Sequence, residues 1–208
     1  MSIIFRYRLM LITDYRYIDD KELGKTIGDA IRGGVDLVQY RDKGADYPLR
    51  VKRAKQLRRL TSDLGAKLII NSDVDIASEV RADGIHFPST FLLSNIPEKK
   101  NLFFGFSAHN KEEIKQGESI GADYLLVSPL FSPGSKAIYS PQLGEKGLKK
   151  LCSKTTIPIF ALGGINEGNV SAAVRSGAYG VASVTGLLLS GDIFETAKRM
   201  REAISLGK

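Results

Sequence analysis

The chain has 208 residues, a length that fits one α/β barrel better than two minimal domains. With 43% hydrophobic and 25% charged residues, its composition is that of an ordinary globular protein and excludes a disordered chain. The apolar stretch near the N-terminus is short and interrupted by arginine, and no run approaches the ~20 apolar residues of a membrane span. We therefore expect a cytoplasmic protein with no membrane association.

The net charge of +7 would suit an anionic partner such as nucleic acid. The basic residues are scattered, however, and lie mostly in expected helices that also carry acids, as in 198–208. Such runs are typical of solvated helix faces, so we expect no nucleic-acid partner. The single cysteine, Cys152, excludes an internal disulfide and a multi-cysteine metal site, and it is expected to act as a small hydrophobic residue late in a helix.

Short β-branched or apolar runs alternate along the chain with amphipathic segments, a pattern that predicts repeated βα units and a mostly parallel sheet. The predicted strands are 8–13, 35–41, 66–71, 84–87, 102–107, 124–128, 157–162 and 180–184. The helical segments between them include 20–34, 47–65, 110–121, 143–154 and 166–177, and several end in glycine.

Eight strands with eight connections favour a closed barrel, because closure leaves no strand edges exposed. We therefore predict one (β/α)₈ TIM barrel, with residues 1–208 forming a single domain. The segment with least regular structure is 129–145, which follows the sixth strand. In such a barrel it lies at the carboxyl ends of the strands, where active sites are built.

The second strand runs into two basic residues at its carboxyl end. Gln39, Arg41 and Lys43 alternate along the chain and share one face, so an amide, a guanidinium and an ammonium group can converge on one anion. The alternative is that Arg41 or Lys43 forms a salt bridge with a neighbouring acid.

Polar residues also end the next three strands. Asn71 and Ser107 are equally compatible with helix caps and with ligand contacts, whereas Asp73 is expected to cap a helix. The spacing of His86 and His109 does not predict that they bind a metal together. For His86, inside an apolar strand, a hydrogen-bonded core role is favoured over catalysis.

Two glycine-containing turns follow the last two strands. Gly163 and Gly164 lie where the seventh strand turns toward a helix, and Val184, Thr185 and Gly186 open a short helix after the eighth. A double glycine alone indicates only a tight turn. Two such turns in consecutive loops of a barrel can direct amide N–H groups and a helix N-terminus at a phosphate, so we predict a small phosphorylated ligand there.

Seven motifs in this order and at these distances resemble the thiamine-phosphate synthase and thiazole tautomerase family. They are QYRDK, LIINSDVDIA, ADGIHF, FSAH, GADYLLVSPLFSPGSK, FALGGINEGNV and GVASVTGLL. The resemblance extends from about residue 8 to residue 190 and implies a barrel with two adjoining substrate sites.

The resemblance also implies roles for particular residues. Those matching the pyrimidine diphosphate site are Gln39, Arg41, Lys43 and Asn71. Ser107, Ser135 and Lys136 match residues between the two substrates, and Gly163, Gly164, Val184 and Thr185 match the thiazole phosphate site. Arg41, Lys43 and Lys136 are the catalytic candidates, because fixed cations stabilise a departing diphosphate, and Lys136 lies on a loop able to close over it.

This chain departs from the family pattern at three positions. Where the synthases carry two Mg²⁺-binding aspartates, it has Ser72 after the third strand and the segment Phe87-Pro88-Ser89-Thr90-Phe91 after the fourth. The expected metal ligands are thus not preserved, which favours the tautomerase-like branch. The histidine associated with tautomerase proton transfer, however, is replaced by Ser128.

The leading hypothesis is a transferase of thiamine biosynthesis that joins hydroxymethylpyrimidine diphosphate to thiazole phosphate and releases diphosphate. Mg²⁺, if used, would be held by substrate oxygens and by Asp73 or Asp83. The alternatives are a thiazole tautomerase-like isomerase and a non-catalytic protein that binds thiazole phosphate or thiamine phosphate. Assembly into a homo-oligomer is left open.

Overall fold

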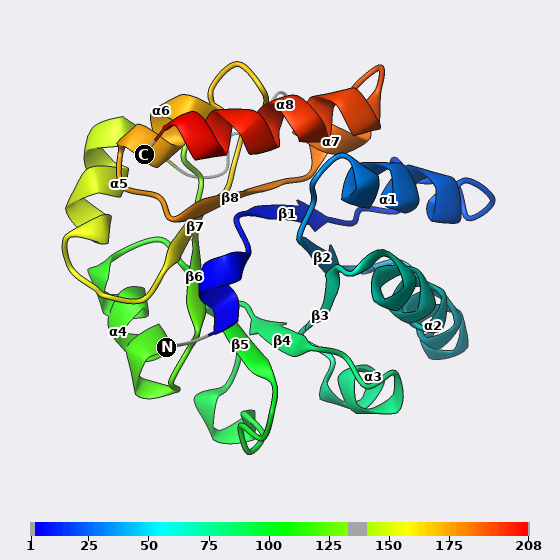
Figure 1. The fold of residues 1–208 in the computed structure, drawn as a ribbon. Coiled ribbons are helices and arrows are strands. Elements are labelled where there is room, and N and C mark those ends of the chain that lie inside the picture. Colours follow the sequence, from blue (N-terminus) through cyan, green and yellow to red (C-terminus); the bar gives the residue numbers. More distant parts are fainter. Residues whose placement is uncertain (1–2, 133–140, 208) are drawn as a thin grey trace.

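The computed structural model describes residues 3–132 and 141–207. Its strands form one closed parallel barrel in the order β1 to β8, with β8 paired to β1 (Figure 1). The strands are β1 (Leu9–Ile12), β2 (Leu37–Tyr40), β3 (Lys67–Asn71), β4 (Gly84–Phe87), β5 (Phe103–Ala108), β6 (Tyr124–Val127), β7 (Ile159–Ala161) and β8 (Gly180–Ser183). The predicted TIM barrel is therefore confirmed, and the predicted strand ends differ from these bounds by at most two residues.

Helices surround the barrel. They are α1 (Leu23–Arg32), α2 (Tyr47–Leu64), α3 (Val74–Glu79), α4 (Lys111–Ser119), α5 (Gly144–Cys152), α6 (Val170–Arg175), α7 (Thr185–Leu188) and α8 (Ile193–Leu206). The connection from β4 to β5 departs from the expected βα repeat, because it contains only the 3₁₀ helix η2 (Leu93–Asn95). The predicted segments did not include α3, which is six residues long.

The strands are buried on both faces, which explains their nearly continuous apolar runs. Side chains on the inner face fill the barrel, including Met10, Leu37, Tyr124 and Phe160. Side chains on the outer face pack against the helices in a second, larger cluster. The interior is therefore a packed core and not a pore, and open space begins only above the carboxyl ends of the strands.

The 3₁₀ helix η1 (Ile3–Arg6) closes the other end of the barrel and lies inside the ring of strands in Figure 1. Ile4 is fully buried in the inner cluster. The guanidinium of Arg8 lies 4.5 Å from the centre of the Tyr179 ring, and Tyr7 packs edge-on against Phe103. This segment thus acts as a plug at the amino ends of the strands.

We expect Ile4→Ala to lower the free energy of unfolding by ~2–4 kcal/mol, because it leaves a cavity in the plugged core. Urea unfolding measures the loss. Leu206→Ala is the matched control, since Leu206 is 84% exposed and its truncation is expected to change stability by less than ~0.5 kcal/mol. Equal stability of both variants would show that the plug does not contribute to the core.

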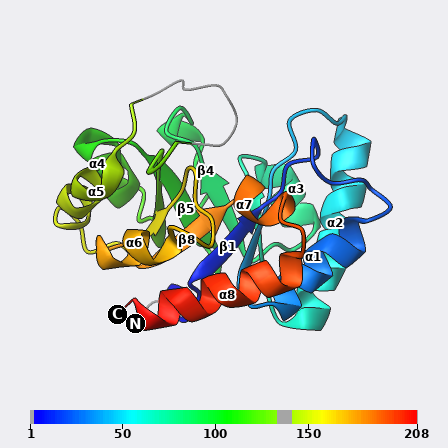
Figure 2. The same cartoon turned by 90° about the horizontal axis from the view of Figure 1, so that it is seen from above.

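The last helix closes the outer ring, where α8 packs along α1 (Figure 2). At the foot of β1, Asp36 accepts hydrogen bonds from the amides of Arg8 and Leu9 at 2.7 and 3.1 Å. The Arg201 guanidinium of α8 donates to the same carboxylate at 2.5 Å. One carboxylate therefore joins α8 to the bottom of the barrel.

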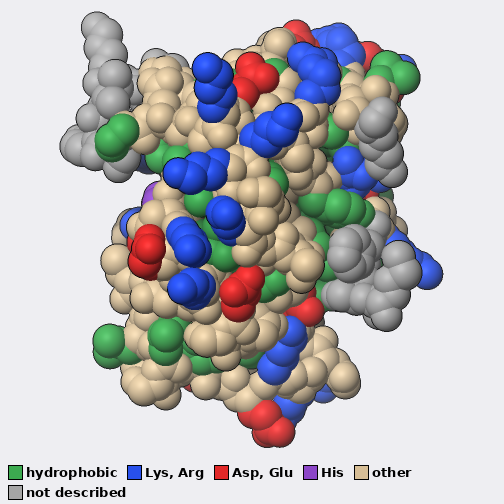
Figure 3. All heavy atoms as spheres, turned by 90° about the vertical axis from the view of Figure 1, so that its left-hand side faces the viewer, with side chains coloured by type: hydrophobic (Ala, Val, Ile, Leu, Met, Phe, Trp, Pro, Cys, Tyr) green, Lys and Arg blue, Asp and Glu red, His purple; other side chains and the backbone are tan. Residues whose placement is uncertain are grey.

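The charged surface carries both signs. On the face that includes α4 and α5, basic side chains are interspersed with acidic ones (Figure 3). Along the described residues, no helix is both long and apolar enough to cross a membrane.

Cys152 ends α5 and is half-buried, and burial raises the pKa of its thiol to about 11, consistent with its expected role as a small hydrophobic residue.

Candidate active site

The end of β2 directs two cationic side chains at the barrel mouth. Thr13, just after β1, holds the backbone of Arg41 on both sides: its hydroxyl accepts from the Arg41 amide at 2.9 Å and donates to the Arg41 carbonyl at 3.1 Å. Gln39 is 1% exposed inside the barrel. Gln39, Arg41 and Lys43 line one cavity, and among the described residues neither Arg41 nor Lys43 has an ion-pair partner. The alternative of a local salt bridge is therefore wrong for the part of the chain that the structure describes.

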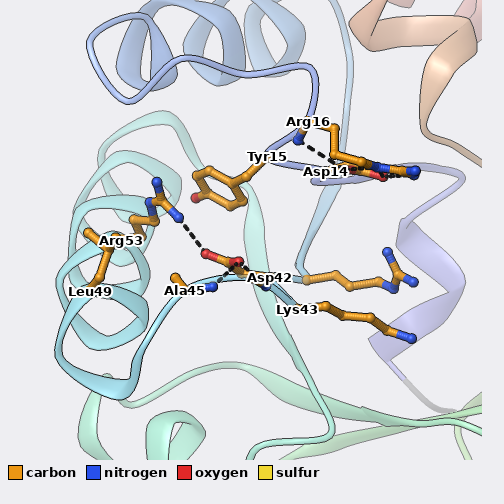
Figure 4. Close-up of a pocket in the computed structure, with 10 residues that line it drawn as sticks. Asp14, Tyr15, Arg16, Asp42, Lys43, Ala45, Leu49 and Arg53 are labelled. Atoms are coloured by element: carbon orange, nitrogen blue, oxygen red, sulfur yellow. Dashed lines mark hydrogen bonds and ion pairs between the residues drawn. The ribbon is translucent and has the colours of Figure 1, made fainter.

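Asp42, between the two cations, faces the opposite way (Figure 4). Its carboxylate accepts from the Arg53 guanidinium at 2.6 Å and from the amides of Gly44 and Ala45 at 3.1 and 3.2 Å. Burial alone would raise the pKa of Asp42, but these donors hold it below its ordinary value. Arg53 also binds Asp20 at 2.6 Å, so α2 anchors the loops after β1 and β2 together.

Two residues after β1, absent from our predictions, complete this part of the wall. Arg16 donates to the Asp14 carboxylate through Nε at 3.0 Å and Nη2 at 2.6 Å, and both residues line the same cavity as Arg41. The hydrogen bond from Arg16 is the main reason that the pKa of Asp14 is lowered. The sequence contains a pattern that could have predicted them, because Asp14 and Arg16 directly follow the first strand, just as Arg41 follows the second.

The third strand ends at the cavity with Asn71 and Ser72. The Asn71 amide donates to the Ser72 hydroxyl at 2.9 Å, and Ser72 adopts a positive φ of 66°. Asp73 points away: it caps α3 by accepting from the Ile76 amide at 2.9 Å and binds Arg50 at 2.8 Å. The expected cap at Asp73 is confirmed, whereas Asn71 lines the cavity wall.

A buried histidine forms the cavity floor. His86 is 2% exposed, and its Nε2 lies 2.8 Å from the Ser107 hydroxyl. Its Nδ1 is buried and has no hydrogen-bond partner within residues 3–132 and 141–207, and its ring stacks on Tyr124 with centroids 5.8 Å apart. A Cβ on Gly105 would lie 2.6 Å from this Nδ1, so only glycine fits beneath the ring. His86 is thus hydrogen-bonded in the core, as expected, and also lines the cavity.

The other histidine lies at the rim. His109 is exposed, and its Nδ1 is 2.7 Å from Glu113. The two histidines therefore have different surroundings, and neither belongs to a metal-binding group among the described residues.

Burial lowers the pKa of His86 from 6.5 to about 3. Below pH 6.5 the unfolded chain takes up a proton that folded His86 does not, so this residue makes stability fall as the pH decreases. We expect the unfolding free energy of the parent to fall by ~1.4 kcal/mol per pH unit more steeply than that of His86→Gln between about pH 6 and 4. Urea unfolding at several pH values tests this, and parallel curves for the two proteins would contradict it.

The turns after β7 and β8 meet at another part of the cavity wall, next to the loop after β1, because β8 pairs with β1. Gly163 and Gly164 have φ values of 98° and 65°, and a Cβ on Gly164 would lie 2.4 Å from the Ser132 carbonyl oxygen. The Ser183 hydroxyl donates to the Ile165 carbonyl at 2.8 Å. A Cβ on Gly186 would lie 2.1 Å from that carbonyl, so the two turns touch.

Four amide groups in these turns have no protein acceptor within residues 3–132 and 141–207. They belong to Gly163, Gly164, Val184 and Thr185, all of which line the cavity. Buried or half-buried amide groups are seldom left without an acceptor, so donors converging on one cavity indicate a site for an anionic group. The turns predicted from the double glycine and the short helix are thus adjacent.

The cavity between these features has a volume of about 580 Å³. Arg16, Arg41 and Lys43 border it on the side of β1 and β2, and the amide-rich turns border it on the side of β7 and β8. A second cavity of about 640 Å³ continues outward over Asp14, Arg16 and Lys43 (Figure 4). Ser135 and Lys136, the remaining predicted site residues, lie outside the described residues.

The donor set does not fit a divalent metal. Asp73 is engaged by Arg50 and by its cap, and Asp83 lies at the amino end of β4, bound to Lys67 at 2.9 Å and Arg58 at 2.5 Å. Neither residue lines the cavity, so the expectation that Asp73 or Asp83 holds Mg²⁺ is wrong. Across the described residues, no group of three His, Cys, Asp or Glu side chains could hold a metal.

A closed parallel barrel with a polar cavity at the carboxyl ends of the strands defines the class of TIM-barrel proteins, in which this end is where active sites are built. Residues 9–187 match the model of the thiamine monophosphate synthase family, and the chain belongs to that family. Members of the family act on small phosphorylated substrates and are generally Mg²⁺-dependent.

Individual relatives cover nearly the whole chain. It is 35% identical over 205 residues to a thiamine-phosphate synthase of Chloroflexus aurantiacus, covering 98% of this chain and 95% of that protein. It is 36% identical over 199 residues to that of Syntrophomonas wolfei, covering 94% and 95%. Among solved structures, a thiamine phosphate pyrophosphorylase from Pyrococcus furiosus is similar with a TM-score of 0.85 and 27% identity, covering 99% of both chains.

Proposed function

We propose that this protein joins hydroxymethylpyrimidine diphosphate to thiazole phosphate and releases diphosphate and thiamine phosphate. The observation that supports the proposal is one cavity with two donor-rich walls. One wall carries Arg41 and Lys43, and the other carries four amides, and none of these groups has an acceptor or an ion-pair partner among the described residues. Two phosphorylated substrates can thus lie in it with their reacting ends between the walls. Holding both reactants in one site converts a bimolecular step into a unimolecular one.

In this reaction the bond between the pyrimidine methylene carbon and the diphosphate oxygen breaks, and the oxygen keeps the electron pair. The thiazole nitrogen supplies its lone pair to the same carbon, so a carbon–nitrogen bond replaces the carbon–oxygen bond. Negative charge accumulates on the departing diphosphate, and the side chains of Arg41 and Lys43 are proposed to stabilise it there. No proton transfer is needed to balance the step.

The amides of Gly163, Gly164, Val184 and Thr185 are proposed to bind the phosphate of the thiazole. Backbone donors are fixed in place, so they orient the thiazole without the entropy loss of ordering a long side chain. Neutral His86 and Ser107 line the cavity from β4 and β5, where the pyrimidine ring is proposed to bind together with Gln39 and Asn71. Ser135 and Lys136 are proposed to complete the site from the segment that follows β6.

A condensation assay with both substrates tests the proposal. Purified protein is expected to form thiamine phosphate and to release one diphosphate per product. Binding of thiazole phosphate without product formation would instead indicate a binding protein. Interconversion of thiazole phosphate isomers without condensation would indicate the tautomerase-like alternative.

The proposed reaction implies that the partners of this protein are small molecules. The scattered charge favours small phosphorylated metabolites over nucleic acid, and we propose a cytoplasmic location for this biosynthetic step.

A further inference from the structure

The cationic wall contains almost no negative charge. Among the described residues, Asp14 is the only carboxylate that borders the main cavity, and it is engaged by Arg16. Asp42 forms an ion pair with Arg53, and Asp73 forms an ion pair with Arg50. A divalent cation therefore finds no unengaged carboxylate on this wall, although hard cations of this kind prefer such ligands.

Arg16 is placed to contact the same anion as Arg41 and Lys43. All three line both cavities. Figure 4 shows Arg16 and Lys43 extending to the same side, away from Arg53 and α2. The Arg16 side chain is 75% exposed while its partner Asp14 is 9% exposed, so the guanidinium projects from a buried anchor into the open part of the site.

Asp14 leaves most of the Arg16 guanidinium available. It accepts from Nε and from Nη2, which are two of the five N–H donors of an arginine. The other three donors lie in the same fixed plane and can bind phosphate oxygens in the two-pronged manner that favours arginine over lysine. Asp14 thus acts as a positioning residue, and Arg16 is free to be a ligand.

We propose that Arg16, Arg41 and Lys43 bind the diphosphate group as a metal-free anion, with Arg16 supplying the positive charge that a divalent cation supplies in other members of the family. This inference rests on the proposed function, because it concerns the diphosphate of the same reaction. The three cations carry three positive charges against the one negative charge of Asp14, and the Asp14 carboxylate holds Arg16 toward the site.

Titration calorimetry with inorganic diphosphate tests the inference without requiring turnover. The parent is measured in excess EDTA and again with Mg²⁺ present. We expect the affinity in EDTA to be at least as high as with Mg²⁺, because Mg²⁺ binds diphosphate in solution and competes with the site for the metal-free anion. For Arg16→Gln we expect a ~10–100-fold weaker affinity in EDTA, since a charge-assisted hydrogen bond is lost. Arg59→Gln is the matched control, because Arg59 is exposed on α2 and lies outside the cavity.

Asp14→Asn provides a second readout, because it keeps the size of the side chain and removes the charge that orients Arg16. We expect weaker diphosphate binding together with an unchanged affinity for thiazole phosphate, which a general loss of folding would not produce. Thermal unfolding of each variant is followed in parallel.

Two results would overturn the inference: diphosphate binding that requires Mg²⁺, or an affinity of Arg16→Gln equal to that of Arg59→Gln. Failure of the proposed function is recognised separately, as the absence of thiamine phosphate in the condensation assay.

Discussion

Gly186→Ala is expected to weaken thiazole phosphate binding by about 100-fold, or ~2.7 kcal/mol. The new Cβ would lie 2.1 Å from the Ile165 carbonyl oxygen and 2.7 Å from the Ser183 hydroxyl. The carbonyl belongs to the backbone of the β7 turn, so relief of the clash must move the two turns apart. Once the turns have moved apart, their amides can no longer all reach the phosphate. Each charge-assisted hydrogen bond to the phosphate that is lost costs ~1.5–3 kcal/mol.

Calorimetry with thiazole phosphate measures this loss. Gly191→Ala is the matched control, because it lies just beyond α7 and no atom is within 4 Å of its added Cβ. Ser183→Ala is a gentler variant that removes only the hydrogen bond joining the turns, and it is expected to weaken binding by ~5–10-fold. Parent-like affinity in both Gly186→Ala and Ser183→Ala would contradict the role given to the contact between the turns.

Arg41→Gln and Lys43→Gln are each expected to lower the rate of condensation at saturating substrates by ~10²–10³-fold, because each removes a fixed charge from the departing diphosphate. The larger loss is expected for Arg41, whose backbone is held on both sides by Thr13. Released diphosphate is followed in steady-state assays. A loss confined to KM would show that these cations bind the substrate without stabilising the transition state.

Lys52→Gln is the control for the charge change, since Lys52 is exposed on α2 away from the main cavity. Its rate is expected to equal that of the parent. Comparable rates in Arg41→Gln, Lys43→Gln and Lys52→Gln would contradict the assignment of the cationic wall.

The strands were predictable because they are buried on both faces. Their apolar runs, such as 84–87, end where polar residues or glycine begin, and the structure has a strand at each of these positions. The β4–β5 connection was not predictable in the same way. Its segment lacks a long amphipathic period, and only η2 forms there, so the βα repeat is incomplete at this point.

The candidate site was predictable where strand alternation continues past the strand end. Gln39, Arg41 and Lys43 were expected on one face, and they line one cavity. The contact between His86 and Ser107 could not be foreseen, because it depends on the register between β4 and β5, in which His86 lies opposite Gly105. Sequence spacing within a parallel barrel does not specify that register.

The contact between the turns after β7 and β8 also could not be predicted from the sequence. A glycine at position 186 predicts a flexible turn, but nothing in the sequence indicates that the Ile165 carbonyl lies opposite it. The sequence motifs did not predict Asp14 and Arg16 for a different reason, because those motifs begin at the second strand, whereas the loop after the first strand supplies a further cation to the cavity.

We propose above all that the thiazole phosphate binds to the amides of the β7 and β8 turns, which have no acceptor in the described part of the chain. Amide proton and nitrogen NMR shifts during a titration with thiazole phosphate test it most directly. We predict the largest downfield proton shifts at Gly163, Gly164, Val184 and Thr185, saturating with the affinity seen by calorimetry. Saturation of binding with these four amides unshifted would contradict the account.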